Sequence, residues 1–214
     1  MSDSLTKTLV IANVLVYVIL GLVYGGVIGL IITPKTVLYM LGFYNKRVLM
    51  GEYWRFITSL FIHAGFWHIF LNMLWFYIFG VKFEEKFGSL SLFIVYFASG
   101  IIGNVFTLIF YGPETNSVGA SGCIFGVLGA YVVASKMSAG EKVGGAIANI
   151  LVYCILISLA PGINLAAHLG GLVTGIVLGF IVALVKRRGR RYPYEYYGYY
   201  YCYPSRMLSL GCNI

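Results

Sequence analysis

Acidic side chains, and charged residues in general, are scarce in this sequence. Only 10% of the 214 residues are charged, whereas 60% are hydrophobic, and Asp3 is the one aspartate. A chain this apolar is not expected to fold as a soluble domain, so we expect an integral membrane protein with one helical bundle. The scarcity of acidic groups also argues against two kinds of catalytic site. The zinc-binding run His-Glu-x-x-His is absent, and the chain lacks the two membrane aspartates that an aspartyl enzyme needs.

Cysteines are also few. The four cysteines, Cys123, Cys154, Cys202 and Cys212, have no motif spacing, so we expect no disulfide framework, no zinc site and no cofactor. The net charge of +8 could by itself suggest a nucleic-acid partner. The placement of the charges argues against one, because basic residues separate the apolar runs and gather after the last of them.

The apolar runs predict an all-α membrane protein with a bundle of six transmembrane helices. The first run is about 24 residues long and has no small-residue cleavage site, which indicates a span and not a signal peptide. The six predicted spans are Leu9–Ile32, His68–Phe83, Leu90–Tyr111, Ser121–Ser135, Val143–Leu159 and Leu165–Val185.

Lysine and arginine indicate the orientation. Six spans would put both termini on one side of the membrane, and 11 of the 15 basic residues fall on that side. The positive-inside rule therefore predicts that the N-terminus (residues 1–8) and the tail (residues 187–214) are cytoplasmic. The first outer loop, residues 33–67, is expected to be structured and to lie in the membrane interface. The tail is basic and rich in tyrosine, and its basic run favours anionic lipid headgroups.

A Gly-x-Ser-Gly run places Ser121 at the head of a short apolar segment. A helix of about 16 residues covers only about 24 Å, less than the roughly 30 Å hydrocarbon core, so Ser121 is expected below the membrane surface. Polar groups at that depth are costly and usually functional. His68 opens the second span and His168 lies near the start of the sixth, so both are expected in the same layer as Ser121. Asn72 would lie one turn deeper than His68, on the same helix face.

Acyl transfer is the chemistry that these side chains predict. A serine is a weak nucleophile until a base takes its proton, so we expect Ser121 and His168 to form a catalytic dyad. The usual third member is an aspartate, but Asp3 is expected at the cytoplasmic N-terminus, on the opposite face of the membrane from Ser121. The imidazole would therefore be oriented by packing or by a neutral partner. The expected oxyanion donors are the Ser121 backbone N–H and the side chains of His68 and Asn72.

Pairs of glycines four residues apart occur on the fourth and sixth spans, Gly122 with Gly126 and Gly171 with Gly175. Such pairs let helix backbones approach closely. A direct hydrogen bond between Ser121 and the histidine of the sixth span would require that approach.

These residues resemble the motifs of the rhomboid family of intramembrane serine proteases. The resemblance covers about residues 8–186 and does not include the tail. Five motifs in the family's order are far more specific than Gly-x-Ser-Gly alone. The matching runs are Gly119-Ala120-Ser121-Gly122 for GxSG, Ala167–Gly175 for AHxxGxxxG, His68–Asn72 for HxxxN, Trp54-Arg55 for WR, and Glu84 with Gly88 for ExxxG.

By this resemblance, residues 9–186 would form a six-span catalytic domain. The nucleophile would be Ser121, the general base His168, and the oxyanion would be bound by His68, Asn72 and the Ser121 amide. Four residues would shape the site, namely Gly119 in the turn before the serine, Gly122 and Gly171 at the helix contact, and Phe125. Trp54 and Arg55 would stabilise the first loop, and Glu84 would be structural.

One position departs from the family's pattern. Many members carry a tyrosine four residues after the serine, stacked under the histidine. Phe125 stands there and keeps the ring without the hydroxyl. We expect activity to survive this change.

The resemblance implies a membrane-protein substrate, typically with a single span, cut near the outer face of the lipid bilayer. Two alternatives remain. A non-cutting relative would bind transmembrane segments, although such proteins typically lose the serine or the histidine. A small transporter would need polar residues along its pore, whereas the residues in the inner halves of spans four and six are apolar or small. No oligomeric state is predicted.

Overall fold

The computed structural model describes residues 4–191, and side-chain environments as far as Lys186. The described chain is mostly helical, with one short two-stranded sheet. The predictions for the tyrosine-rich tail, from residue 192 onward, lie outside the described residues. The elements in chain order are α1 (Leu5–Gly25), η1 (Gly26–Leu30), α2 (Lys35–Leu41), β1 (Phe43–Tyr44), α3 (Asn45–Leu49), α4 (Arg55–Thr58), η2 (Ser59–Phe61), α5 (Phe66–Phe87), α6 (Ser89–Phe110), β2 (Asn116–Ser117), α7 (Ser121–Ser138), α8 (Gly144–Ser158) and α9 (Leu165–Arg191).

Five segments of the described chain are long and apolar enough to cross a membrane: α1 continued by η1, then α5, α6, α7 and α9. The chain is therefore a multi-pass integral membrane protein. A helix occupies each of the six predicted segments, but α8 has 15 residues and covers only about 22 Å. The prediction of six spans is thus supported for five of them, and the fifth predicted segment, Val143–Leu159, stays a prediction as a span.

The first predicted span, Leu9–Ile32, begins and ends earlier in the structure than the hydropathy indicated. Helix α1 begins at Leu5 because Ser4 caps it, accepting a hydrogen bond from the Lys7 amide at 3.5 Å. The α-helix ends at Gly25, and Gly26 takes a φ of +57°, which only glycine adopts at little cost. Apolar residues after this turn belong to the 3₁₀ helix η1.

Glu84, predicted to be structural, lies near the end of α5 and caps the start of α1. Its carboxylate accepts hydrogen bonds from the Leu5 and Thr6 amides at 2.7 and 3.0 Å, at the positive end of the α1 dipole. The hydroxyls of Ser4, Thr6 and Ser89 donate to the same carboxylate at 2.7–2.8 Å. Glu84 therefore joins the end of α5 to the start of α1 and the start of α6.

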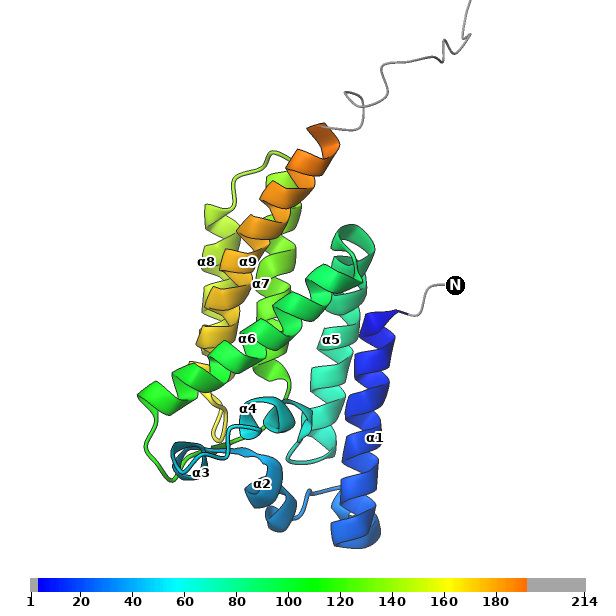
Figure 1. Cartoon of the computed structure of the whole chain (residues 1–214), viewed down its shortest axis with the longest axis vertical. Coiled ribbons are helices and arrows are strands. Elements are labelled where there is room, and N and C mark those ends of the chain that lie inside the picture. Colours follow the sequence, from blue (N-terminus) through cyan, green and yellow to red (C-terminus); the bar gives the residue numbers. More distant parts are fainter. Residues whose placement is uncertain (1–3, 192–214) are drawn as a thin grey trace, which may run out of the picture.

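The segment between α1 and α5 is structured, as predicted. It contains three short α-helices and two 3₁₀ helices, and β1 pairs antiparallel with β2, with Phe43 opposite Ser117. The sheet thus fastens this segment to the connection between α6 and α7. In Figure 1 the short helices α2, α3 and α4 gather at one end of the bundle.

Arg55 is the buried charge of this segment, with 3% of its surface exposed. Its guanidinium donates to the Tyr39 and Gly42 carbonyls at 3.0 and 2.6 Å and pairs with Glu52 at 2.5–2.7 Å. The other oxygen of Glu52 pairs with Arg47 at 2.9 Å. These contacts fit the predicted stabilisation of the loop by Arg55. The neighbouring Trp54 is different, because its side chain is 55% exposed.

The long helices alternate in direction (Figure 1). Helices α5, α7 and α9 all begin at the end where α2–α4 lie, and α6 crosses the bundle obliquely. Helices α7 and α9 pack closely because glycines line their contact. The Gly171 backbone meets the Gly122 carbonyl, and one turn further the Gly175 backbone meets the Gly126 carbonyl, with no room for a Cβ at either glycine of α9.

Candidate active site

Ser121 is the first residue of α7 and is half-buried. The turn before it depends on Gly119, which has a φ of +114° and donates its amide to the Ser59 carbonyl at 3.0 Å. The first backbone amides of a helix have no partner within the helix. Their N–H groups point out of its N-terminus, which is the positive end of the helix dipole. The Ser121 amide therefore lies where negative charge on a neighbouring atom is stabilised.

His168 lies in the first turn of α9 and is 4% exposed. Its Nε2 is 2.7 Å from Ser121 Oγ. The start of α9 is held by Asn164, whose side-chain oxygen accepts the Ala167 amide at 3.0 Å. The amide nitrogen of Asn164 donates to Thr107 on α6 and Ser117 on β2 at 2.8 and 3.0 Å. The helix that carries the histidine is thus fixed against two other elements.

The second nitrogen of His168 has a partner that the sequence did not reveal. His168 Nδ1 lies 2.7 Å from the hydroxyl of Ser158, the last residue of α8. The Ser158 hydroxyl donates in turn to the Cys154 carbonyl at 2.6 Å. A serine in an apolar helix matches no motif. The only available signal was the expectation of a neutral partner for the imidazole.

His68 lies in the first turn of α5, beside the turn that precedes Ser121. A Cβ added at Gly119 would lie 2.8 Å from both Cε1 and Nε2 of the His68 ring. The Ala64 amide donates to His68 Nδ1 at 3.2 Å. Neutral His68 therefore carries its hydrogen on Nε2, on the Gly119 side.

Asn72, one turn further along α5, is 8% exposed. Its side-chain nitrogen donates to the His68 carbonyl at 2.8 Å. An amide nitrogen carries two hydrogens, so this bond uses one of them and leaves a second donor. The donor count is therefore compatible with the expected contact to an oxyanion.

The Phe125 ring packs against the imidazole, a contact that the family resemblance implied for this position. The ring centroids of Phe125 and His168 are 4.6 Å apart, with the planes inclined by 40°. Cys123, the neighbouring thiol and a possible rival nucleophile, is fully buried. Only Ser121 of these residues combines partial exposure with a hydrogen bond to a histidine.

The remaining predicted site residues are not part of this cluster. Arg55 and Glu84 make the structural contacts described above, and Trp54 is mostly exposed. Within residues 4–186, no group of three potential metal ligands is found.

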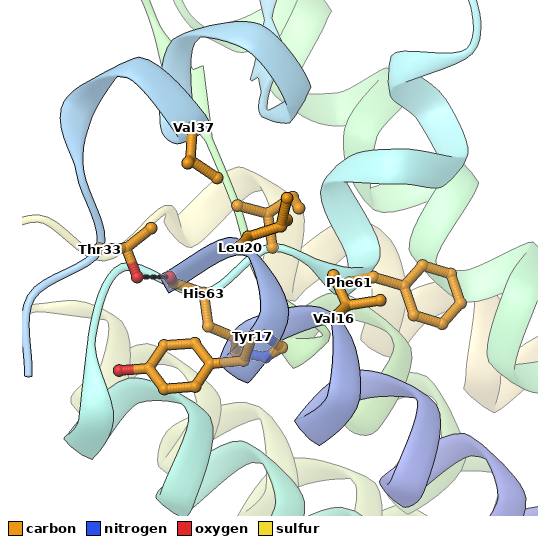
Figure 2. Close-up of a pocket in the computed structure, with 8 residues that line it drawn as sticks. Val16, Tyr17, Leu20, Thr33, Val37, Phe61 and His63 are labelled. Atoms are coloured by element: carbon orange, nitrogen blue, oxygen red, sulfur yellow. Dashed lines mark hydrogen bonds between the residues drawn. The ribbon is translucent and has the colours of Figure 1, made fainter. Parts of the chain in front are cut away.

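A small pocket that Ser121 does not line lies between α1 and the segment that follows it (Figure 2). Tyr17 and His63 line it, and Thr33 donates to the His63 carbonyl at 2.6 Å. It has room for about one water molecule. His63 is 1% exposed, and neither of its ring nitrogens has a hydrogen-bond partner among the described residues. A pocket of this size cannot hold a peptide segment, so it is not a substrate site.

Comparison with known proteins gives the family. The model of the Rhomboid domain matches residues 50–185. The chain belongs to the rhomboid family. Among its relatives, the protein named "Putative rhomboid protease YdcA" of Bacillus subtilis (strain 168) is 37% identical over 153 residues, which are 70% of this chain and 76% of YdcA.

Two other rhomboid relatives are longer than the matched region. RHOMBOID-like protein 6, mitochondrial, of Arabidopsis thaliana is 34% identical over 150 residues, or 67% of this chain and 48% of that protein. Rhomboid protease GluP of B. subtilis is 34% identical over 149 residues, or 66% of this chain and 28% of GluP. The chain therefore spans about half of the first of these and less than a third of the second.

Proposed function

We propose that this rhomboid is an intramembrane serine endopeptidase that uses Ser121 and His168 as a catalytic dyad. The observation that carries the proposal is the 2.7 Å hydrogen bond between Ser121 Oγ and His168 Nε2, at the start of two closely packed helices. Two named relatives, YdcA and GluP, add support because their names describe rhomboid proteases.

In the proposed reaction, Ser121 Oγ attacks the carbonyl carbon of the scissile peptide while His168 Nε2 takes the hydroxyl proton. The new negative charge falls on the former carbonyl oxygen. The Ser121 amide, His68 Nε2–H and the free Asn72 N–H would donate to that oxygen. His168 then gives the proton to the leaving amine, and the serine ester remains. A water molecule, deprotonated by the same imidazole, hydrolyses the ester and restores Ser121.

The substrate proposed is a membrane protein with a single span, cut near the outer membrane face. The starts of α5, α7 and α9 lie together at one end of the bundle, so the cut would occur near that end. In the proposed orientation both termini are cytoplasmic, and α8 is a sixth, short span. No metal or other cofactor takes part in the proposed mechanism.

The experiment is cleavage of a single-span substrate, labelled at both ends, in liposomes that contain the full-length protein and a chelator. We expect cleavage by the wild type and none by Ser121→Ala. Ser135→Ala is the matched control, because the Ser135 hydroxyl is buried on the same helix without a hydrogen-bond partner among the described residues. A fluorophosphonate should label Ser121 in the wild type and in the control.

Equal cleavage by wild type and Ser121→Ala would overturn the proposed mechanism. Failure of the wild type both to cleave and to react with the fluorophosphonate would favour a non-cutting binder of transmembrane segments. Passage of solutes through the liposomes without cleavage would favour a transporter.

A further inference from the structure

We propose that Ser158 is a positioning residue that holds the hydrogen of the His168 imidazole on Nδ1. This inference rests on the proposed function, since it concerns the protonation state that a general base needs. It also extends that function, because it adds a third helix, α8, to the two that carry the dyad.

The argument begins with the Ser158 hydroxyl, which has one hydrogen to donate. The hydroxyl is 2.6 Å from the Cys154 carbonyl, four residues earlier on α8. A carbonyl oxygen can only accept, so the single hydrogen of Ser158 goes to Cys154. The Ser158 oxygen is left as an acceptor toward its other neighbour.

That neighbour is His168 Nδ1, at 2.7 Å. Two acceptors cannot form a hydrogen bond, so Nδ1 must carry the hydrogen and donate it to Ser158. A neutral imidazole has only one N–H, so Nε2 is left with its lone pair. Nε2 faces Ser121 Oγ at 2.7 Å, and the Ser121 hydroxyl therefore donates to it. This is the arrangement in which the histidine can take the serine proton.

The two site histidines, His68 and His168, carry their hydrogen on different ring nitrogens. His68 Nδ1 accepts the Ala64 amide, so its hydrogen lies on Nε2. One histidine is thus set as an acceptor toward Ser121, and the other as a donor on the Gly119 side. The two settings correspond to a base and an oxyanion donor.

Burial gives the Ser158 contact its importance. Ser158 and His168 are 6% and 4% exposed, so water cannot readily replace a missing partner. A buried N–H without an acceptor is costly, and the imidazole would lower that cost by moving its hydrogen to Nε2. In that tautomer Nε2 can no longer accept the proton of Ser121.

The position of α8 decides whether the contact exists. The buried residues of α8 are Ile150, Cys154 and Ser158, four residues apart on a single stripe. Ser158 is the last member of that stripe, directly before the turn that leads into α9. The tautomer of His168 therefore depends on the packing of the C-terminal end of α8 against α9.

The test compares Ser158→Thr with Ser158→Val, two side chains of nearly the same shape. Threonine in a helix can make the same hydrogen bond to the carbonyl four residues earlier, so it preserves the acceptor, whereas valine removes it. We expect Ser158→Thr to cleave at close to the wild-type rate. Ser158→Val should show a kcat lower by about 5- to 100-fold, with KM unchanged, because a buried donor loses its acceptor.

A second readout reports the tautomer itself. In protein labelled with ¹⁵N-histidine, His168 should show a protonated Nδ1 and an unprotonated Nε2 in the wild type and in Ser158→Thr. In Ser158→Val we expect a mixture of tautomers. The His168 signals are identified by their loss in His168→Asn, and a purely structural role for Ser158 would leave the tautomer unchanged.

Two results would overturn the proposal: equal kcat for the threonine and valine variants, or the same single tautomer in both. The spectra separate this inference from the proposed function. If the wild type cleaves nothing, the protease proposal fails, yet the tautomer comparison in the same protein still decides whether Ser158 holds the proton.

Discussion

The His68 ring occupies the space that a side chain at Gly119 would need, in the turn before Ser121. The Gly119 φ of +114° is a conformation that other residues rarely adopt, and a Cβ there would lie 2.8 Å from Nε2 of the His68 ring. The turn before Ser121 and the His68 ring, which would bind the oxyanion, therefore pack directly against each other.

The first prediction concerns Gly119→Ala, which should strain the turn and push the His68 ring away from it. We expect kcat to fall by about 100-fold, because a shift near 1 Å in catalytic geometry has effects of that size. The matched control is Gly140→Ala at the end of α7, where φ is +77° but no atom lies within 4 Å of the added Cβ. Gly140→Ala should lower stability through backbone strain alone and leave kcat unchanged. Equal losses of kcat in the two variants would show that the His68 contact does not matter.

The second prediction concerns coupling within the dyad. Ser121→Ala and His168→Ala should each abolish measurable cleavage, and the double variant should be little worse than either, because the residues act as one unit. The measurement is single-turnover cleavage in liposomes with enough enzyme to detect residual activity. Losses that multiply in the double variant would argue that Ser121 and His168 contribute independently.

The contact between Ser121 and His168 could be predicted from sequence because the chain offers so few alternatives. Three histidines, one aspartate and an apolar background leave few side chains able to perform acyl transfer. Alternating helix directions then place the starts of α5, α7 and α9 at the same end of the bundle. The helix locations followed from hydropathy in a similar way, since apolar runs of this length are typical of membrane-spanning helices and rare elsewhere.

Ser158 could not be predicted in this way. Its contact with His168 depends on the turn between α8 and α9, which brings two residues ten positions apart onto facing surfaces. A hydroxyl in an apolar helix is more often satisfied by its own backbone, and Ser158 does make such a bond. The start of α1 was missed for a related reason, because its cap is completed by Glu84, a residue 79 positions away from Leu5.

The third prediction concerns Glu84, which should matter for stability and not for chemistry. Glu84→Gln replaces one acceptor oxygen by a donor that faces other donors. We expect it to lower the free energy of unfolding by about 1–3 kcal/mol, the cost of leaving such groups unpaired. The matched control is Glu85→Gln, because Glu85 is the adjacent carboxylate and is exposed. Denaturation in detergent measures the loss, and kcat per folded molecule should be unchanged in both variants. A lower kcat in Glu84→Gln would mean that the cap also positions the site.

The last prediction concerns pH and the buried ring of His63, which lies outside the long helices. Burial, with a smaller effect from the neighbouring His68, lowers the pKa of the His63 imidazole to about 3. The unfolded chain binds a proton there below about pH 6.5, whereas the folded chain stays neutral, so stability should fall as the pH drops from 6.5 toward 3. His63→Phe removes this contribution and also removes two ring nitrogens without partners among the described residues. We expect the thermal midpoint in detergent to fall less between pH 7 and pH 5 in His63→Phe than in the wild type, with cleavage at pH 7 retained. Parallel curves for the two proteins would show that His63 is protonated as easily in the folded state as in the unfolded chain.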